Sequence, residues 1–385
     1  MKFREYLMED ALEAIIDYRG KTPHKADTGI PTLSAKSVKN NHINYSECYY
    51  ISEDEYKRFM VRGFPQKGDI LLTTEAPMGM VAKLDRSDVA IAQRLLTLRG
   101  KEGVLDNDYL LYLLQSPYGQ GLLKERETGT TVTGIKQAEF RRIVIRLPDI
   151  AVQRKIGSVL SAIDQKIKCN TKINDNLQQQ AAALFANFYD HAETEVGFTE
   201  IIQILGGGTP KTGESSYWNG NVAFFTPRDV GSPYTLTTEK TITEEGLAHC
   251  NSRLYPINTV FVTARGTVGK VGLPGIPMAM NQSCYALVGK HTHQLLVYFY
   301  TLKAVDRLKH KASGAVFDAI TTRDFESEII MKLSDDDAKV FLDVAEPIYQ
   351  AVLSNSIENL RLAALRDSLL PRLMSGEIDV SDIQI

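Results

Sequence analysis

The feature that most constrains the fold of this chain is an internal repeat. Every seventh residue from Ile156 to Leu184 belongs to a series that recurs 185 residues later, from Phe341 to Leu369. Both series are apolar except for one asparagine at the same step. A heptad period of this kind predicts two long helices, each of which buries one stripe. The expected seam residues are Ile156, Ile163, Asn170, Leu177 and Leu184 in the first helix, and Phe341, Ile348, Asn355, Leu362 and Leu369 in the second.

The repeat extends into the sequence that precedes each helix. "GKTP" at Gly20 corresponds to "GGTP" at Gly207, and "GDILLTTEAPMGMV" corresponds to "NTVFVTARGTVGKV". Nearer the helices, "AQRLLTLRGK" matches "NQSCYALVGK", and "GTTVTGIKQAEF" matches "GAVFDAITTRDF". A chain of 385 residues is also long for a single hydrophobic core. We therefore predict a globular domain at 1–146, a helical region at 147–190, a second globular domain at 191–333 and a second helical region at 334–385.

The two globular domains have a mixed α/β pattern. "DILLTT", "NTVFVTA" and "CYALVG" are short, apolar and bounded by glycines, as is typical of strands. "DYLLYLLQSPYGQGLLKE" and "QLLVYFYTLKAVDRLKH" are longer and amphipathic, which predicts a helix for each. The acidic stretch at 190–197 predicts a linker. The predicted fold class is two tandem mixed α/β (α+β) target domains separated by two long antiparallel coiled-coil helices.

The helices are expected to run antiparallel because each must stay beside its own globular domain while the two helices pair. Asn170 and Asn355 fall near the middle of their helices, and we expect them in one layer of the pair. A buried polar layer can fix the register of two helices. The alternative is that each asparagine borders a solvated face.

Composition limits where the protein works. No run of about 18 apolar residues and no signal peptide is present, so the sequence predicts neither membrane insertion nor export. Four cysteines lie far apart without CxxC spacing, which predicts free thiols in a reducing compartment. We therefore expect a cytoplasmic protein.

The sequence carries no convincing catalytic motif. Asp149 and the "DQK" at Asp164 resemble a metal-dependent nuclease pattern, but both acids fall on one expected helix. "ARGTVGK" lacks the glycine and the Ser or Thr of a phosphate-binding loop, since Ala264 and Val271 stand there. His291 and His293 have no third ligand in view, and no methyltransferase motif is found. The prediction is a non-enzyme without a metal or a cofactor.

The charge distribution leaves room for a DNA-facing surface. The net charge is −3, yet residues 251–320 carry net +6 and residues 321–385 carry net −7. A basic surface and an acidic helical tail are therefore averaged together. Bases are read by Arg, Lys, Asn, Gln or acidic side chains on loops, whereas phosphates are bound mainly by cations and small donors.

Candidate DNA contacts lie on matched loops of the two domains. In the first domain they are Lys21, Thr22, His24, Lys25, Ser34, Lys36, Thr74, Glu75, Gln93 and Arg94. In the second domain they are Lys211, Thr212, Tyr217, Trp218, Thr226, Arg228, Arg265, Thr267, Lys270, Asn281 and Gln282. The run "KAVDRLKHK" adds Lys303, Arg307, Lys309 and Lys311 as a candidate phosphate rail. Any one cation could instead be a solvated surface charge, and Trp218 could anchor its own loop.

This duplicated pattern resembles the specificity subunit of type I restriction-modification systems over essentially the whole chain. "LPDIAVQRKI" is similar to the Leu-Pro…Gln…Ile opening of the family's first conserved helix, and "LRDSLLPRLMSGEI" is similar to its C-terminal signature. "GGTP", "YWNG" and "FFTPRDV" resemble the start of its recognition domains. The second helix departs from the pattern, because "LSDDDAKVF" lacks the proline and the glutamine. Ser334 can cap that helix instead.

The resemblance implies a subunit without catalytic activity that binds an asymmetric, bipartite double-stranded DNA sequence. Its partners would be two methyltransferase subunits and, in the full complex, restriction-translocase subunits. Apolar residues beyond the two-helix seam favour docking of partner helices. The expected partner-binding residues are Phe185, Phe188, Leu370 and Leu373.

Two other readings of the sequence are kept. A stand-alone two-headed DNA-binding or scaffold protein would show the same repeat but would have no modification partners. A self-sufficient nuclease or methyltransferase is disfavoured by the missing motifs. The recognised bases and the spacer length do not follow from the sequence.

Overall fold

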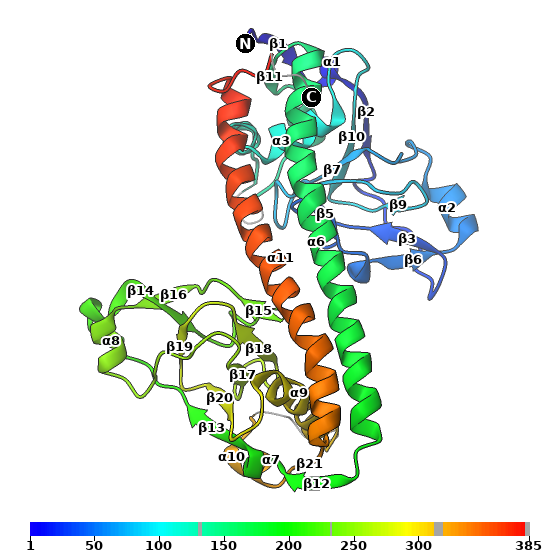
Figure 1. Ribbon diagram of the computed structural model, residues 1–385. Coiled ribbons are helices and arrows are strands. Elements are labelled where there is room, and N and C mark those ends of the chain that lie inside the picture. The colour runs from blue at the N-terminus through cyan, green and yellow to red at the C-terminus, as the bar shows by residue number, and fades with distance from the viewer. Residues whose placement is uncertain (130–132, 232, 312–318, 382–385) are drawn as a thin grey trace. The chain divides into compact units, whose positions relative to one another are not determined.

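The computed structural model of the chain describes residues 1–129, 133–231, 233–311 and 319–381 (Figure 1). Its contacts divide the chain into two compact units. Unit 1 consists of Met1–Ile167 and Arg361–Ile385, and unit 2 consists of Lys168–Leu360. Each unit therefore combines one globular domain with a part of each long helix.

The centre of unit 1 is an antiparallel four-stranded sheet with the order β2-β10-β7-β8. Its strands are β2 (Leu12–Asp17), β10 (Leu95–Gly100), β7 (Ile70–Thr73) and β8 (Val81–Lys83). A second sheet has the order β6-β3-β9, formed by β6 (Tyr49–Ile51), β3 (Ile30–Leu33) and β9 (Ala90–Ile91). Two small pairs complete the strands: β1 (Arg4–Leu7) with β11 (Val144–Leu147), and β4 (Val38–Lys39) with β5 (His42–Ile43).

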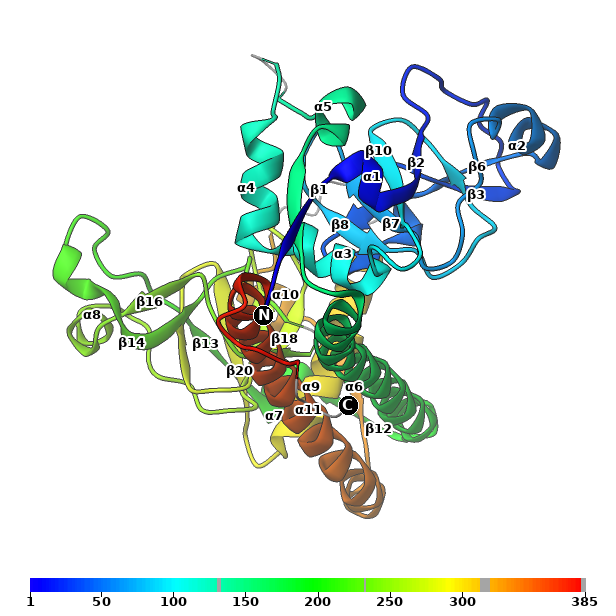
Figure 2. The ribbon, with the colours of Figure 1, turned by 90° about the horizontal axis from the view of Figure 1, so that it is seen from above.

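Short helices flank these sheets within unit 1. They are α1 (Met8–Ala11), α2 (Glu53–Phe59), α3 (Asn107–Gln115), α4 (Pro117–Glu125), α5 (Gln137–Arg141) and the 3-10 turn η1 (Tyr45–Glu47). In the view of Figure 2, α4 and α5 lie on one side of the four-stranded sheet, and α2 with β3 and β6 lies on the other. The core joins the sheet to α3 and to both long helices, as the burial of Leu72, Tyr109, Ile156 and Leu373 shows.

Unit 2 repeats this architecture. Its main sheet has the order β13-β20-β17-β18-β15, and its second sheet the order β16-β14-β19. The strands are β13 (Ile202–Gly206), β20 (Cys284–Gly289), β17 (Val260–Thr263), β18 (Val271–Pro274), β15 (Tyr234–Thr235), β16 (Lys240–Ile242), β14 (Trp218–Phe225) and β19 (Met278–Met280). A further pair joins β12 (Thr194–Gly197) to β21 (Ile329–Lys332). The helical pieces are α7 (Phe198–Ile201), η2 (Ser215–Tyr217), α8 (Glu244–Ala248), α9 (Gln294–Lys311) and α10 (Thr322–Glu326).

The structure confirms that the two domains are copies of one fold, and it also shows where they differ. In both second sheets the central strand pairs parallel with one neighbour, β3 with β9 and β14 with β19. One predicted helix of unit 1 is in fact two, α3 and α4, whereas α9 of unit 2 is continuous. The break falls at Ser116, whose ψ is 155°. Pro117 causes it, because a proline removes a backbone donor and forces the preceding residue into the extended region.

The two long helices are α6 (Ile150–Asp190) and α11 (Asp335–Ser375), each of 41 residues. Gln153 explains the start of α6: its buried amide donates to the Pro148 and Val104 carbonyls at 2.9 and 2.8 Å. Ser334 caps α11 as expected, since its Oγ accepts from the Asp337 amide at 3.1 Å. Among the described residues, no helix has the length and apolar character needed to cross a membrane.

Contacts within each unit show that α6 and α11 pack together antiparallel, as predicted. In unit 1, Asp164 near the start of α6 pairs with Arg366 near the end of α11, with 2.7 Å between Oδ1 and Nη1. Asp164 also accepts from the Tyr112 hydroxyl at 2.6 Å, and burial, followed by this contact, raises the pKa of Tyr112. The acid of the "DQK" sequence is therefore part of the helix interface.

In unit 2, four asparagines replace the single polar layer that was predicted. Asn170 donates to Asn359 and Asn355 donates to Asn174, both at 2.9 Å. The prediction that Asn170 and Asn355 share one layer is wrong, because each meets the asparagine one turn away from the other. The solvated-face alternative is also wrong, since Asn170 and Asn174 are 1% and 6% exposed.

The asparagine pairs are expected to contribute measurably to stability. Replacing Asn174 by alanine removes the acceptor of Asn355 and the donor to Val352 O and Ser356 Oγ. We expect the free energy of unfolding to fall by about 1–3 kcal/mol in chemical denaturation, because polar partners are left unpaired. The double replacement of Asn174 and Asn355 by valine should recover part of that loss. Asn176→Ala, at an exposed position of the same helix, is the control, and an equal effect of both alanines would contradict the prediction.

Candidate DNA interface

In both units the turn after the central strand is closed by the same threonine. In unit 1 the Thr73 hydroxyl donates to Pro77 O at 2.7 Å and accepts from the Met80 amide at 2.9 Å. In unit 2 the Thr263 hydroxyl contacts Thr267 O and accepts from the Lys270 amide at 2.9 Å. The turns between β7 and β8 and between β17 and β18 are therefore equivalent and rigidly held. They present different side chains on one backbone frame.

A second loop lies directly beside each turn. The Thr74 amide donates to Arg94 O at 3.0 Å, and the Ala264 amide donates to Ser283 O at 2.8 Å. A third segment joins them, because the Ile135 and Ile320 amides donate to Thr74 O and Ala264 O, both at 2.9 Å. Three segments that are far apart in sequence thus meet at one place in each unit. These contacts align Glu75 with Arg265, and Arg94 with Ser283.

The meeting point in unit 1 carries an ion pair. Arg94 Nε lies 2.7 Å from Glu75 Oε1, and their side chains are 51% and 35% exposed. A hollow of about 250 Å³ adjoins Glu75 and is lined by Arg19, Thr74 and Lys136 among others. Sequence reasoning missed Arg19 and Lys136, because no motif or period connects residues that are so widely spaced. At the surface, the acid and the cations of this site could engage both donors and acceptors of a nucleic acid.

Thr74 does not reach the surface, contrary to the prediction. Its side chain is 1% exposed, and its hydroxyl has no hydrogen-bond partner among the described residues. The reason is its position directly after β7, whose four residues are all buried. Its neighbour Glu75 is the first residue of the turn that solvent can reach.

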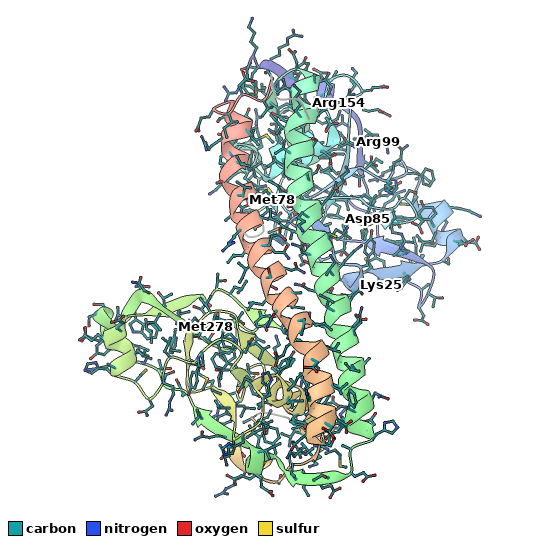
Figure 3. The ribbon with its side chains drawn as sticks, viewed as in Figure 1. Lys25, Met78, Asp85, Arg99, Arg154 and Met278 are labelled. Carbon is teal, nitrogen blue, oxygen red and sulfur yellow. The ribbon has the colours of Figure 1, made fainter. Side chains whose placement is uncertain are left out.

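The other candidates of unit 1 lie near its second sheet. Lys21, Thr22, His24, Lys25 and Lys36 are exposed, and Ser34 is half-buried. Lys25 lies over the Tyr49 ring, 4.9 Å from its centroid (Figure 3). The His24 amide donates to Glu55, and this bond, followed by Arg58, lowers the pKa of the Glu55 carboxyl. Gln93 is exposed beside Arg94.

In unit 2 several aromatic and small candidates hold their own loops together. Trp218 donates from Nε1 to Lys211 O at 3.3 Å, so it anchors the loop that carries Lys211 and Thr212. Tyr217 stacks on His249 with 5.0 Å between ring centroids. The Thr226 hydroxyl donates to Asp229 at 2.6 Å.

Cations and amides near the unit 2 turn remain accessible. Arg265, Lys270 and Gln282 are exposed, and Arg228 is 84% exposed with a long 3.9 Å contact to Glu239. The Thr267 hydroxyl donates to Pro227 O at 3.1 Å. Asn281 Oδ1 accepts from the Ser283 amide at 3.1 Å.

The candidate phosphate rail on α9 is not one surface. Arg307 Nε lies 3.3 Å from Glu328, Lys311 contacts the same carboxylate, and Lys303 lies 3.8 Å from Asp190. These three cations are four residues apart, so they share one helix face and pack against the unit itself. Lys309 lies on another face. The prediction overlooked this helical periodicity, and Lys309 alone of the four lines the hollow beside the β17–β18 turn.

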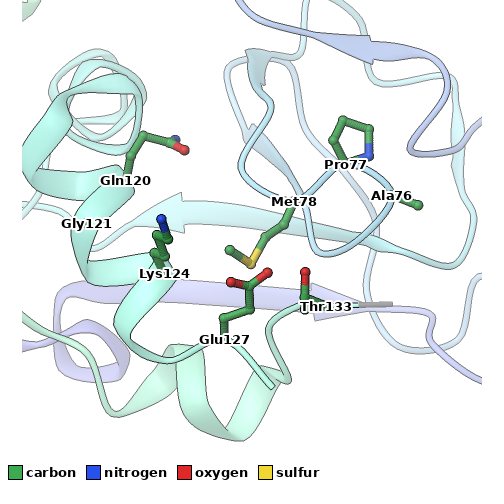
Figure 4. Close-up of a pocket in the computed structure, with 8 residues that line it drawn as sticks. All are labelled: Ala76, Pro77, Met78, Gln120, Gly121, Lys124, Glu127 and Thr133. Carbon is green, nitrogen blue, oxygen red and sulfur yellow. The ribbon is translucent and has the colours of Figure 1, made fainter. Parts of the chain in front are cut away.

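Each unit has a hollow between this turn and the adjacent helix. In unit 1 it measures about 630 Å³ and lies between Pro77 and Met78 of the turn and Gln120 and Lys124 of α4 (Figure 4). Gln120 ties the helix to the turn by donating to Gly79 O at 2.9 Å. The hollow of unit 2 measures about 470 Å³ and contains Lys309.

The expected partner-binding residues are occupied by the units themselves. Phe185 is 1% exposed and packs in the unit 2 core, with its ring 4.9 Å from that of Phe299. Phe188 is half-buried against the same core. Leu370 and Leu373 are 8% and 2% exposed in the core of unit 1. Both helix ends bury their apolar residues on the adjoining domain, so this part of the prediction is corrected.

The duplicated architecture also occurs in known proteins. The family model for the type I restriction modification DNA specificity domain matches residues 15–179 and again residues 194–332. The MjaIX type I restriction enzyme specificity subunit of Methanocaldococcus jannaschii is 23% identical, over 92% of this chain and 88% of that protein. The HindI type I restriction enzyme specificity subunit of Haemophilus influenzae is 22% identical, over 81% of this chain and 87% of that protein. The crystal structure of a type I restriction-modification S subunit from M. genitalium has the same fold, with a TM-score of 0.64 at 14% identity over 97% of this chain and 96% of that chain.

Proposed function

Because the chain belongs to the family of type I restriction-modification DNA specificity subunits, we propose that its two units read two different halves of one bipartite DNA sequence. The protein is the non-catalytic subunit that gives DNA specificity to a type I restriction-modification complex. This family membership decides against the stand-alone scaffold that the sequence left open. The asymmetry of the target, the residues that contact it and the number of partner subunits are parts of the proposal.

The observation that carries the proposal is the pair of equivalent turns with different side chains. On one backbone frame, unit 1 presents Glu75 and Arg94, whereas unit 2 presents Arg265 and Ser283. Two identical readers would bind a palindrome. Because the side chains differ in charge at matched positions, the two half-sites should differ in sequence.

The direct test is selection of bound DNA from a random pool by this subunit assembled with its methyltransferase. The expected result is a sequence with two specified parts that are not inverted copies of each other, separated by a spacer without preference. Enrichment of a palindrome would contradict the asymmetric reading. Enrichment of one continuous site would contradict the division between two units.

We also propose that two methyltransferase subunits bind, one to each unit, and that restriction-translocase subunits join the full complex. DNA-reading surfaces should differ between the units, but surfaces for a repeated partner should be alike. Two matched positions expose large apolar side chains in both units. They are Phe64 with Leu254, 55% and 49% exposed, and Val144 with Ile329, 44% and 55% exposed.

A charge at one matched position is expected to remove one partner. Val144→Glu and Ile329→Glu should each lower the number of bound methyltransferase subunits from two to one, and the double variant should bind none. Mass measurement of the purified complexes gives these numbers. Val61→Glu is the control, because Val61 is 64% exposed but has no apolar counterpart in unit 2. Full binding by the double variant would place the partner surface elsewhere.

A further inference from the structure

Arg94 is held in a backbone conformation that its residue type rarely adopts. Its φ is +70°, in the left-handed region that favours glycine. Conformations of this kind persist where the surrounding structure enforces them, often at functional sites. Here the Arg94 carbonyl is fixed by the Thr74 amide at 3.0 Å, and the guanidinium is fixed by Glu75 at 2.7 Å. The fold thus fixes both the main chain and the side chain of this arginine.

The fold itself does not need this ion pair. In unit 2 the same frame carries Arg265 in place of Glu75 and Ser283 in place of Arg94, so no such pair forms there. An ion pair as exposed as Glu75 and Arg94 also adds little to stability, about 0–1 kcal/mol. Its geometry is therefore available for recognition.

The pair offers a distinct hydrogen-bonding pattern. The carboxylate of Glu75 is an acceptor, and the guanidinium beside it is a planar set of donors. In the major groove a cytosine–guanine pair presents the reverse order, with the cytosine N4 donor next to the guanine O6 and N7 acceptors. An adenine–thymine pair offers no donor followed by two adjacent acceptors.

We propose that Glu75 and Arg94 together read one cytosine–guanine pair in the half-site of unit 1, with Glu75 on the cytosine and Arg94 on the guanine. This inference rests on the proposed function. Arg265 has no acidic neighbour at the matched positions and reads guanine by itself in the half-site of unit 2. The two half-sites therefore each contain a cytosine–guanine pair, but only the one in unit 1 is read on both bases.

The test is selection of bound DNA by variants assembled with the methyltransferase. Arg94→Ala should lose the preference for cytosine–guanine at one position of one half-site and bind the original sequence about 5- to 150-fold more weakly. Glu75→Gln should weaken the preference at the same position. Arg265→Ala should relax one position of the other half-site. Arg86→Ala is the control, because Arg86 forms an exposed pair with Asp88 in unit 1 that is apart from the turn.

The outcomes separate this inference from the proposed function. If the unmodified complex selects a bipartite sequence but Arg94→Ala keeps every preference, the reading by this pair is wrong while the proposed function stands. Equal weakening of all sequences by Arg94→Ala would make it a phosphate contact and would also overturn the inference. If the unmodified complex selects no bipartite sequence, the proposed function itself fails. Measured unfolding of each variant should match the unmodified chain, since the pair is exposed.

Discussion

Exchanging residues 194–333 for the corresponding segment of a relative will change one half of the recognised DNA sequence and leave the other half intact. The exchanged segment carries the whole second domain, including the β17–β18 turn and the loop at Gln282. It must begin at Thr194, because β12 pairs with β21 and both strands have to come from one parent. The spacer between the half-sites should not change, since neither long helix is exchanged.

The effect should be complete at the exchanged half-site. Each base pair that no longer matches costs about 1–3 kcal/mol, so several together abolish binding to the original sequence. Selection of bound sequences by the chimaera with its methyltransferase measures both half-sites at once. The matched control exchanges residues 1–146 and should alter only the other half. A change in both half-sites after one exchange would show that the units do not read independently.

The chimaera has one structural requirement. Phe341 and Tyr349 of α11 belong to the unit 2 core, and their rings lie 5.1 and 5.7 Å from that of Phe299. The donor domain must therefore offer an apolar surface at the position of Phe299. A donor with a polar residue there would leave two buried aromatic rings without a partner, and misfolding would then hide the readout.

The repeat in the sequence was enough to predict most of the architecture. The offset of 185 residues between the heptad series equals the offset between the bounds of α6 and α11. The antiparallel pairing followed from chain connectivity alone. Asn174 and Asn359 obey the same offset, so the second asparagine pair could have been found in the sequence. It was missed because only every seventh residue was read.

Features that depend on distant partners could not be predicted. The linker expected at 190–197 contains β12, whose only signal is its pairing with β21, more than 130 residues away. The burial of Phe185 and Leu373 depends on domains that pack over the helix ends, which a helical period does not show. The Glu75–Arg94 pair joins two loops, and no local pattern in the sequence indicates that they meet.

Lengthening both long helices by one heptad is expected to widen the spacer and keep both half-sites. The insertions belong after Ile167 in α6 and after Leu360 in α11, where the contacts of the two units divide. Asp164 keeps Arg366 within unit 1, and the asparagine pairs stay together within unit 2. Seven residues lengthen a helix by about 10 Å. DNA advances about 3.4 Å per base pair, so the spacer should grow by up to roughly three base pairs.

The prediction rests on the proposal that the paired helices set the distance between two independent readers. Affinity should fall in the lengthened variant, because a shift of roughly three base pairs also turns the second half-site around the DNA axis. An insertion in α6 alone is the control. It cannot preserve both the Asp164–Arg366 contact and the asparagine pairs, so it should destabilise the chain and abolish selection. If the doubly lengthened complex selects the original spacer, the helices do not set the distance, and the half-sites must be positioned by the partner subunits instead.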